Sequence, residues 1–183
     1  MDKYDIYSKG LVYWITGLSG AGKTTLGQLL YHRQKAEGEN VVILDGDELR
    51  EIINNKDYSY EGRKQVATQY SRMCKMLSDQ GIDVIICTIS MFDEVRDWNR
   101  KNIENYCEIY IEVPIEELIR RDQKQLYSRA LKKEVKNVMG IDADFEEPKN
   151  PDVIIRNDGK LEIEDVYNNL KEEINAYKRR KKE

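Results

Sequence analysis

Residues 17–24 read GLSGAGKT, and this stretch constrains the fold of the chain more than any other segment. It matches the pattern G-x-x-x-x-G-K-[ST], in which glycines let the backbone approach an anion and the loop N–H groups point inward. An apolar run at residues 12–16 precedes the loop, and leucines at helical spacing follow it. We therefore expect a strand, a phosphate-binding loop and a helix in succession, and a bound nucleoside triphosphate.

The side chains of this loop have separate expected tasks. Lys23 is expected to reach the β- and γ-phosphates, and the Thr24 hydroxyl to ligate Mg²⁺. The helix that starts at the loop directs the positive end of its dipole toward the phosphates. A glycine-rich turn with a chance lysine is the alternative, and the flanking strand and helix disfavour it. The predicted nucleotide-binding residues of the loop are Gly17, Ser19, Gly20, Ala21, Gly22, Lys23, Thr24 and Thr25.

Composition narrows the class of protein. The 183 residues, 40% of them apolar, are expected to form a single domain over residues 1–183 with one core. A net charge of −4 argues against nucleic acid or an anionic membrane as the main partner. We expect no transmembrane helix and no signal peptide, because no apolar segment has the required length or position. Three widely spaced cysteines without a Cys-x-x-Cys indicate reduced thiols in a cytoplasmic protein.

Short apolar runs alternate with segments of helical spacing along the chain. This alternation predicts an α/β fold, with right-handed crossovers and a parallel sheet that carries helices on both faces. Ligands of such a sheet bind at the carboxyl ends of its strands. Strands are expected at residues 12–16, 41–44, 84–89, 109–113 and 153–155, and helices from the loop to about 37 and at about 61–78, 93–104 and 161–177. Residues 48–60 are polar, and we expect them to be irregular.

Two carboxylates, Asp45 and Asp47, follow the second predicted strand. Beside a nucleotide loop, such a pair can hold Mg²⁺ or take a proton from an attacking hydroxyl. An Asp-Gly turn is the plain alternative. The expected closeness of this strand end to the loop favours a functional role. Arg50 would share a face with Asp47 if a helical turn follows, and could then meet a substrate phosphate.

A strongly basic segment follows the fourth predicted strand, which Pro114 ends. In phosphoryl-transfer enzymes such a segment can close over the nucleotide, exclude water and neutralise developing charge. We therefore expect a charged lid over about residues 120–147, with a solvated helix face as the alternative. The basic run at residues 178–182 is instead expected to be a solvated helix end. The basic residues of the lid segment are Arg120, Arg121, Lys124, Arg129, Lys132, Lys133 and Lys136.

Four motifs resemble, in order, those of the adenylyl-sulfate kinases, which use ATP to phosphorylate the ribose 3′-hydroxyl of adenosine 5′-phosphosulfate. Residues 17–23 have the family's form of the loop, and residues 45–50 match D-G-D-x-x-R. Residues 121–127 match R-D-x-K-G-L-Y except for the glycine, and residues 140–148 loosely match G-I-D-x-P-Y-E-x-P. The resemblance covers about residues 11–156. It implies a P-loop kinase-type sheet with a lid, ATP and Mg²⁺ as cofactors, small-molecule nucleotide substrates and a homodimer.

The resemblance also implies roles for individual residues. The implied catalytic residues are Lys23, Asp45 and Asp47, and the implied metal residues are Thr24 and Asp47. Asp47 would act as the base or organise the metal, with the assignment of the base between the two aspartates left open. Arg121 and Lys124 would lie near ATP. The residues implied to bind the acceptor nucleotide are Asp47, Arg50, Tyr58, Arg63, Ser90, Phe92, Lys136 and Val138.

The acceptor side departs from the family pattern, whereas the ATP side does not. Residues 62–69 read GRKQVATQ against the family's D-R-x-E-N-I-R-R, so Val66 and Thr68 replace an asparagine and an arginine that hold adenylyl sulfate. Val138 stands where the family has the second aromatic of a base-stacking clamp, and Tyr58 adds a polar tip to the first. We therefore expect phosphorylation of the ribose 3′-hydroxyl of a different nucleotide 5′-anhydride. A smaller pyrimidine with a different anhydride end fits better. The resemblance offers one such case, kinases similar to this chain that act on cytidine diphosphoramidate in the pathway to bacterial capsular phosphoramidate, so that this acceptor is the first candidate and adenylyl sulfate the second.

Two other classes of function stay open as alternatives. A P-loop nucleotide switch or binding module of the GTPase type would need a guanine-reading Asn-Lys-x-Asp late in the chain. The nearest string, at residues 55–57, has its aspartate one place early and lies in the wrong region. An inactive relative that serves as an interaction domain is disfavoured by the intact Lys23, Thr24 and Asp47.

Overall fold

A five-stranded sheet forms the centre of the computed structural model, which describes residues 8–181. Its strands are β1 Val12–Thr16, β2 Val41–Asp45, β3 Asp83–Thr88, β4 Tyr106–Glu112 and β5 Val153–Arg156. They lie in the order β2-β3-β1-β4-β5, and every neighbouring pair is parallel. The α/β fold with a parallel sheet, predicted from the alternation of strands and helices, is confirmed.

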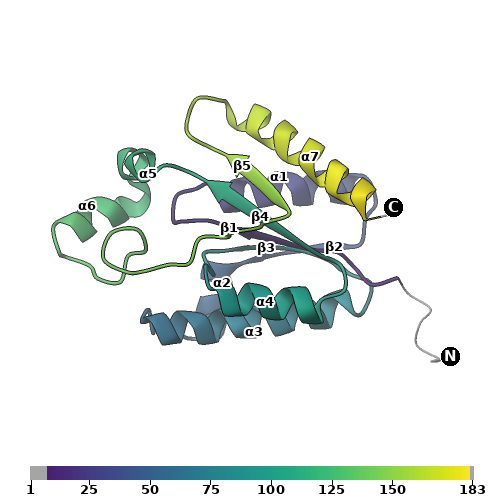
Figure 1. Ribbon diagram of the computed structural model, residues 1–183, viewed down its shortest axis with the longest axis horizontal. Helices are drawn as coiled ribbons and strands as arrows, with labels where there is room; N and C mark the ends of the chain where they lie inside the picture. Colours follow the sequence, from purple (N-terminus) through teal and green to yellow (C-terminus); the bar gives the residue numbers. More distant parts are fainter. Residues whose placement is uncertain (1–7, 182–183) are drawn as a thin grey trace.

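Helices cover both faces of this sheet (Figure 1). They are α1 Lys23–Ala36, α2 Gly46–Ile52, α3 Tyr60–Ser78, α4 Asp93–Asn102, α5 Ile115–Arg121, α6 Leu126–Leu131 and α7 Ile163–Arg180, with a 3₁₀ turn, η1, at Gln123–Gln125. Helices α1 and α7 pack together on one face, and α3 and α4 pack together on the other. Helices α5 and α6 stand at one end of the sheet with the loop that follows them, and this group is the lid segment.

The core is built around β1, the central strand. All five of its side chains are buried, and Tyr13 and Trp14 are among the largest fully buried side chains of residues 8–181. Strands β3 and β4 on either side are buried along nearly their whole length, as expected for a sheet with helices on both faces. Cys87 and Cys107 are free thiols in this core. The packed sheet therefore gives a rigid base to the loops at its carboxyl edge.

Several predicted boundaries differ from the structure, and two of these differences have a clear physical cause. The first part of residues 48–60 is helical, because α2 begins directly after β2 with Asp45 as its cap. The Asp45 carboxylate accepts a hydrogen bond from the Asp47 N–H at 2.9 Å, which satisfies a free donor of the first turn. Strand β4 begins at Tyr106, three residues earlier than predicted. The predicted strand began directly after Glu108, which is charged, but Glu108 is buried within the strand. Arg100 makes this burial tolerable by donating to the Glu108 carboxylate at 2.8 Å.

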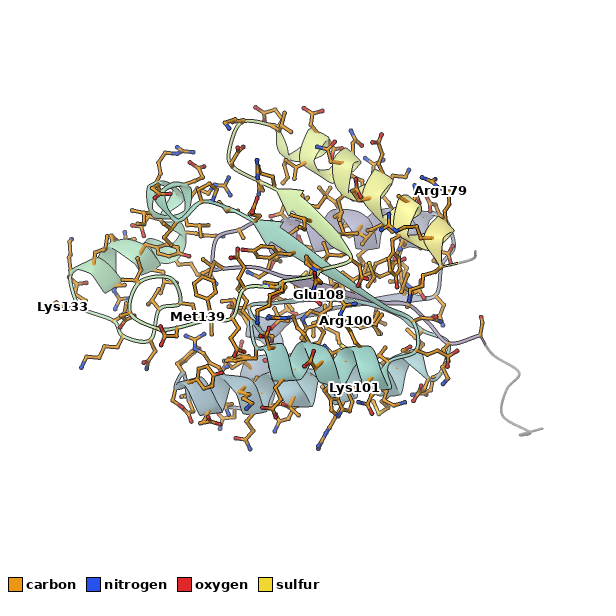
Figure 2. All side chains as sticks on the ribbon, viewed as in Figure 1. Arg100, Lys101, Glu108, Lys133, Met139 and Arg179 are labelled. Carbon is orange, nitrogen blue, oxygen red and sulfur yellow. The ribbon has the colours of Figure 1, made fainter. Side chains whose placement is uncertain are left out.

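The basic end of the chain behaves as predicted as far as it is described. The basic side chains at the end of α7, Lys178, Arg179 and Arg180, are exposed, and Arg179 lies at that end of the helix in Figure 2. Residue 182 of the predicted basic run lies outside the described residues. Within residues 8–181, no helix combines the length and the apolar character needed to cross a membrane.

Candidate active site

A cavity of about 480 Å³ lies at the carboxyl ends of β1, β2 and β3. The phosphate-binding loop, the start of α2, α3 and residues 135–139 of the lid surround it. In Figure 2, Met139 lies on the side of the lid nearest the sheet, whereas Lys133 marks the outer tip of the lid. The predicted site residues that line the cavity are Ser19, Gly20, Gly22, Lys23, Thr24, Thr25, Asp45, Asp47, Arg50, Tyr58, Arg63, Ser90, Phe92, Lys124, Lys136 and Val138. Three others, Gly17, Ala21 and Arg121, are not part of its wall.

Side chains from distant elements hold the phosphate-binding loop by its carbonyl groups. Tyr127 Oη donates to the carbonyl oxygen of Ser19 at 2.8 Å, and Asn157 Nδ2 to that of Ala21 at 2.8 Å. Arg121 Nη1 lies 3.4 Å from the carbonyl oxygen of residue 20. With its carbonyl oxygens bound in this way, the loop is free to present its N–H groups to an anion.

Two glycines of the loop cannot be replaced without distortion. Gly22 has φ 95°, and a Cβ at this position would lie 2.8 Å from Asn157 Nδ2. Gly17 has φ 152°, and its Cβ would lie 2.7 Å from the carbonyl oxygen of Ile111. Both positions therefore need glycine for the backbone angle and for the close approach of a neighbouring group. Gly17 thus shapes the loop from behind rather than lining the cavity.

Lys23 is the buried cation of the site. It is the first residue of α1, and its side chain lines the cavity while only 8% of the residue is exposed. Its Nζ donates to the carbonyl oxygen of Leu18 at 2.8 Å. Burial lowers the pKa of Lys23 to about 8, although the nearby carboxylates of Asp45 and Asp47 favour its charged form. A phosphate group would supply the charged partner that this ammonium group lacks.

The two aspartates have different surroundings. Asp45 Oδ2 accepts a hydrogen bond from Thr24 Oγ1 at 2.7 Å, while its other oxygen caps α2. Asp47 is exposed, and its Oδ2 lies 3.1 Å from Lys124 Nζ of the lid. The metal residues implied by resemblance were Thr24 and Asp47, but Asp45 is the aspartate bonded to Thr24. Asp47 instead faces the open cavity and the lid.

The oxygen atoms at Thr24 and Asp45 fit a magnesium ion. Mg²⁺ commonly takes one or two protein ligands and completes its shell with water and substrate phosphates. In P-loop enzymes these ligands are the loop hydroxyl and a strand-end aspartate. Within residues 8–181, no group of three or more His, Cys, Asp or Glu side chains could hold a metal ion. Thr24 and Asp45 would supply two protein oxygens to such an ion, and nucleotide phosphates and water would supply the remaining ligands.

Two arginines predicted to bind the acceptor are engaged with the protein. Arg63 Nη2 donates to the carbonyl oxygen of Asn137 in the lid at 2.7 Å, and Arg63 Nε to that of Tyr58 at 2.9 Å. Arg50 Nη1 donates to the Asp57 carbonyl oxygen at 2.9 Å. Both guanidinium groups also lie near the Tyr58 ring, 4.7 Å from its centroid for Arg50 and 5.2 Å for Arg63. Their contact with an acceptor stays a prediction.

The part of the cavity between α3, residues 88–92 and the lid is the predicted acceptor half, and buried aromatic side chains line it at Phe92 and Tyr70. Phe92 is buried, and the Tyr60 ring meets it edge-on at 5.1 Å between centroids. Val138 is buried in the cavity wall of the lid, and Tyr58 is about half exposed. Ser90 Oγ lies 2.7 Å from Thr88 Oγ1, so its hydroxyl is held at the end of β3. Phe92 and Val138 thus give this half apolar walls, next to the guanidinium groups of Arg50 and Arg63 and the Ser90 hydroxyl.

The basic residues of the lid segment do not act as one group. Lys124 and Lys136 line the cavity, whereas Arg121 holds the phosphate-binding loop from behind and donates to the Asn157 carbonyl oxygen at 2.7 Å. Lys132 and Lys133 are exposed. The predicted lid thus has two basic residues at the cavity. At its outer tip the basic residues are solvated, as the alternative interpretation predicted.

Three residues that shape the site were not predicted from the sequence to have a role in it. Tyr70 of α3 lines the cavity, and its Oη donates at 2.8 Å to the carbonyl oxygen of Gly46, which lies between the two aspartates. Tyr127 and Asn157 hold the phosphate-binding loop. Asn157 directly follows β5, so its place at a strand end was a usable signal. Nothing in the local sequence distinguishes Tyr70 from a core tyrosine.

Comparison with known proteins identifies relatives of the chain. A family model described as adenylylsulphate kinase matches residues 9–156. Cytidine diphosphoramidate kinase of Campylobacter jejuni is 49% identical over 154 residues, which are 84% of this chain and 90% of that protein. A probable adenylyl-sulfate kinase of Archaeoglobus fulgidus is 41% identical over 148 residues, 80% of this chain and 96% of that protein.

A solved structure shows the same fold with ligands. The Mycobacterium tuberculosis APS kinase CysC in complex with AMPPNP and APS superposes with a TM-score of 0.83 at 29% sequence identity. The match covers 91% of this chain and 98% of that one. The similarity therefore extends over the sheet, the phosphate-binding loop and the lid alike.

Proposed function

The chain belongs to the adenylyl-sulfate kinase family, and from this premise we propose that it phosphorylates the ribose 3′-hydroxyl of cytidine diphosphoramidate. The family fixes the broader activity: the protein is an ATP-dependent nucleotide kinase. The acceptor and the position of transfer are the proposed parts. A cytoplasmic homodimer that acts in capsule biosynthesis is proposed with them, on the family resemblance.

The acceptor half of the cavity is the observation that carries this proposal. A purine base gains most from two aromatic faces, since stacking on one aromatic is worth roughly 1–3 kcal/mol per base. Phe92 supplies a buried ring in this half, but Val138 lines the lid side. Thr68 is not part of the cavity wall, and its hydroxyl donates to the Lys64 carbonyl oxygen at 3.0 Å. A smaller pyrimidine loses less from these features, and the Campylobacter jejuni relative agrees with that choice.

The charged residues support a division of labour in phosphoryl transfer. Lys23 would stabilise the charge that develops on the transferred group, in a buried position where such interactions are strong. Asp47 is exposed to the cavity and would act as the base. It would accept the proton of the ribose 3′-hydroxyl while the oxygen of that hydroxyl forms a bond to the γ-phosphorus. The bond from that phosphorus to ADP breaks in the same transfer. Lys124 lies 3.1 Å from Asp47 and could move to the phosphates.

Thr24 and Asp45 would hold Mg²⁺ beside the phosphates. When bound, the ion neutralises charge on the β- and γ-phosphate oxygens. Asp45 is suited to this task because its second oxygen caps α2, which fixes the carboxylate against the Thr24 hydroxyl. Asp47 then remains available as the base.

Adenylyl sulfate is the second candidate acceptor. Several relatives are adenylyl-sulfate kinases, and the Mycobacterium tuberculosis structure combines that fold with APS. The ATP half of the cavity would serve either acceptor equally well. A nucleotide switch without an acceptor has no support from these relatives.

A screen of acceptors tests the proposal. The purified protein is mixed with ATP and Mg²⁺ and with cytidine diphosphoramidate, adenylyl sulfate or a uridine 5′-anhydride, and ADP release is measured. Phosphorus NMR of the product then identifies the phosphorylated hydroxyl. We expect fast ADP release with cytidine diphosphoramidate and a 3′-phosphate in the product. Release with adenylyl sulfate alone would overturn the acceptor assignment.

A further inference from the structure

The end of the lid segment is bound to the wall of the acceptor half. The N–H of Glu146 donates to the carbonyl oxygen of Met91 at 3.0 Å. The Glu146 carboxylate accepts a hydrogen bond from the N–H of Asp93 at 2.6 Å. These two bonds join one residue to both chain neighbours of Phe92, whose side chain lines the cavity. The backbone of Phe92 is therefore held on both sides by a residue far away in the sequence.

The bond to Asp93 also supplies a helix cap that the local sequence lacks. Phe92 is the residue before α4, and it has no side-chain oxygen to offer the first turn. The first N–H groups of a helix have no partner within the helix. The Glu146 carboxylate takes one of them, and its negative charge suits the positive end of the helix dipole. Glu146 thus stabilises the start of α4 through the Asp93 backbone, while Arg96 and Lys149 bind the Asp93 side chain.

The segment beyond Glu146 is anchored independently. Lys149 Nζ lies 3.0 Å from Asp93 Oδ2, and Arg100 Nη1 lies 3.0 Å from Asp152 Oδ2. Figure 2 shows Arg100 and Glu108 together between α4 and the sheet, where they form an ion pair. Glu146 therefore lies between a firmly attached segment and the lid residues that line the cavity.

We propose that Glu146 is a positioning residue for the acceptor half of the site. It acts through Met91 and Asp93, which fix the Phe92 wall against which the acceptor base lies. It does not line the cavity in this structure, so its effect on acceptor binding is indirect. The proposal rests on the proposed function only in that an acceptor nucleotide occupies this half of the cavity.

Three variants of Glu146 separate the hydrogen bond from the fold. Glu146→Ala removes the carboxylate, and Glu146→Asp withdraws it by one methylene while the backbone bond to Met91 remains. Glu146→Gln keeps an oxygen that can accept from Asp93. We expect the first two to raise the acceptor KM about tenfold, the effect of losing one hydrogen bond of this strength. The ATP KM should stay within about twofold, and Glu146→Gln should resemble the wild type.

Asp144→Ala is the matched control, since Asp144 is an exposed acidic residue two positions away on the same segment. It should leave both KM values unchanged. Equal increases of the acceptor and ATP KM values in Glu146→Asp would overturn the proposal, because they would indicate a general loss of structure. Normal acceptor KM values in Glu146→Ala and Glu146→Asp would overturn it as well.

Amide hydrogen exchange of residues 91–95 tests the same contact without any acceptor. Exchange should accelerate in Glu146→Asp and stay near the wild-type rate in Glu146→Gln. If the wild type phosphorylates none of the acceptors, the proposed function fails, and the exchange rates still decide whether Glu146 holds this wall. Unchanged exchange in Glu146→Asp would contradict the positioning role.

Discussion

Asp45 and Asp47 are two residues apart, yet they occupy different environments. Asp45 is bound on both oxygens, to the Thr24 hydroxyl and to the first turn of α2. Asp47 projects into the cavity, where its carboxylate meets the exposed ammonium group of Lys124. A carboxylate held in place suits a metal, and a carboxylate open to the cavity suits proton transfer. We therefore propose Asp45 as the metal-side residue and Asp47 as the base.

The asparagine variants of these residues should differ in kind. Asp47→Asn should lower kcat by about 10²–10⁴, the usual contribution of a positioned base, with little change in the Mg²⁺ requirement. Asp45→Asn should raise the Mg²⁺ concentration needed for half-maximal activity. Steady-state kinetics over a range of Mg²⁺ concentrations distinguishes the two. If Asp45→Asn loses kcat at saturating Mg²⁺ while Asp47→Asn shifts the Mg²⁺ requirement, the roles are reversed.

Lys23 should make ATP binding dependent on pH. Burial lowers its pKa to about 8, and bound phosphates would favour the charged form and raise that pKa. The complex then holds more protons than the free protein, so ATP affinity should fall as the pH rises above about 8. Calorimetric titration at about pH 8.5 in two buffers of different ionisation enthalpy should show proton uptake. Constant affinity between about pH 7 and pH 9, without uptake, would contradict this prediction.

Val138 should control the choice between acceptor bases. Val138→Phe adds an aromatic side chain to the lid wall of the cavity, in the half that also contains Phe92. The variant should lower the KM for adenylyl sulfate about tenfold, within the range for one stacking contact. Val135→Phe is the control, because Val135 lines the same cavity and receives the same bulk. If both variants lower the KM for adenylyl sulfate equally, the added bulk, and not the position of the ring, causes the change.

At the scale of elements, the turn η1 stands out for its backbone. Asp122, Lys124 and Gln125 have φ values of 39°, 60° and 54°, in the left-handed region that costs most residues about 1–2 kcal/mol. The adenylyl-sulfate kinase motif has glycine at the position of Gln125. This chain therefore keeps a strained backbone next to Lys124, the lid residue that pairs with Asp47.

Gln125→Gly should relieve part of this strain. The gain is offset by the greater freedom of glycine in the unfolded chain, about 0.5–1 kcal/mol, so we expect little change or slight stabilisation. Gln123→Gly is the control, because Gln123 belongs to the same turn and is not among the residues with positive φ. It should destabilise the protein by about 0.5–1 kcal/mol in urea unfolding. A larger loss of unfolding free energy in Gln125→Gly than in Gln123→Gly would show that the backbone at Gln125 is not strained.

Elements with strong local signals could be predicted, and those that depend on distant partners could not. Strand β1 has the predicted bounds, since its apolar run is uninterrupted. The start of β4 was missed because Glu108 is neutralised by Arg100 from α4, a partner that the strand sequence does not reveal. Helix α2 was missed because Asp45 was weighed as a turn residue, and the helix it caps is short.

The same distinction applies to the site. The loop and strand-end motifs indicated most of the residues that line the cavity, because parallel strands bring their carboxyl ends together. The bond between Thr24 and Asp45, and the support of the loop by Tyr127 and Asn157, depend on tertiary packing. The local sequence did not reveal the first two of these contacts, whereas the position of Asn157 directly after β5 was a usable signal.

At the scale of the whole molecule, the cavity has two halves that are built from different elements of the fold. The ATP half is built from the sheet edge and α1, with glycines and carbonyl contacts that permit little variation. The acceptor half is formed by α3, the Phe92 wall and the lid. A family can therefore change its acceptor by altering the lid and α3 while phosphate binding stays the same. The central claim is that this chain has changed its acceptor in this way.

A competition between two acceptors tests that claim most directly. Equal concentrations of cytidine diphosphoramidate and adenylyl sulfate are incubated with the wild-type protein and limiting ATP, and both 3′-phosphorylated products are quantified. The product ratio equals the ratio of the two kcat/KM values. We predict that the cytidine product exceeds the adenosine product at least about tenfold, as the loss of one stacking face implies. An excess of the adenosine product would contradict the account.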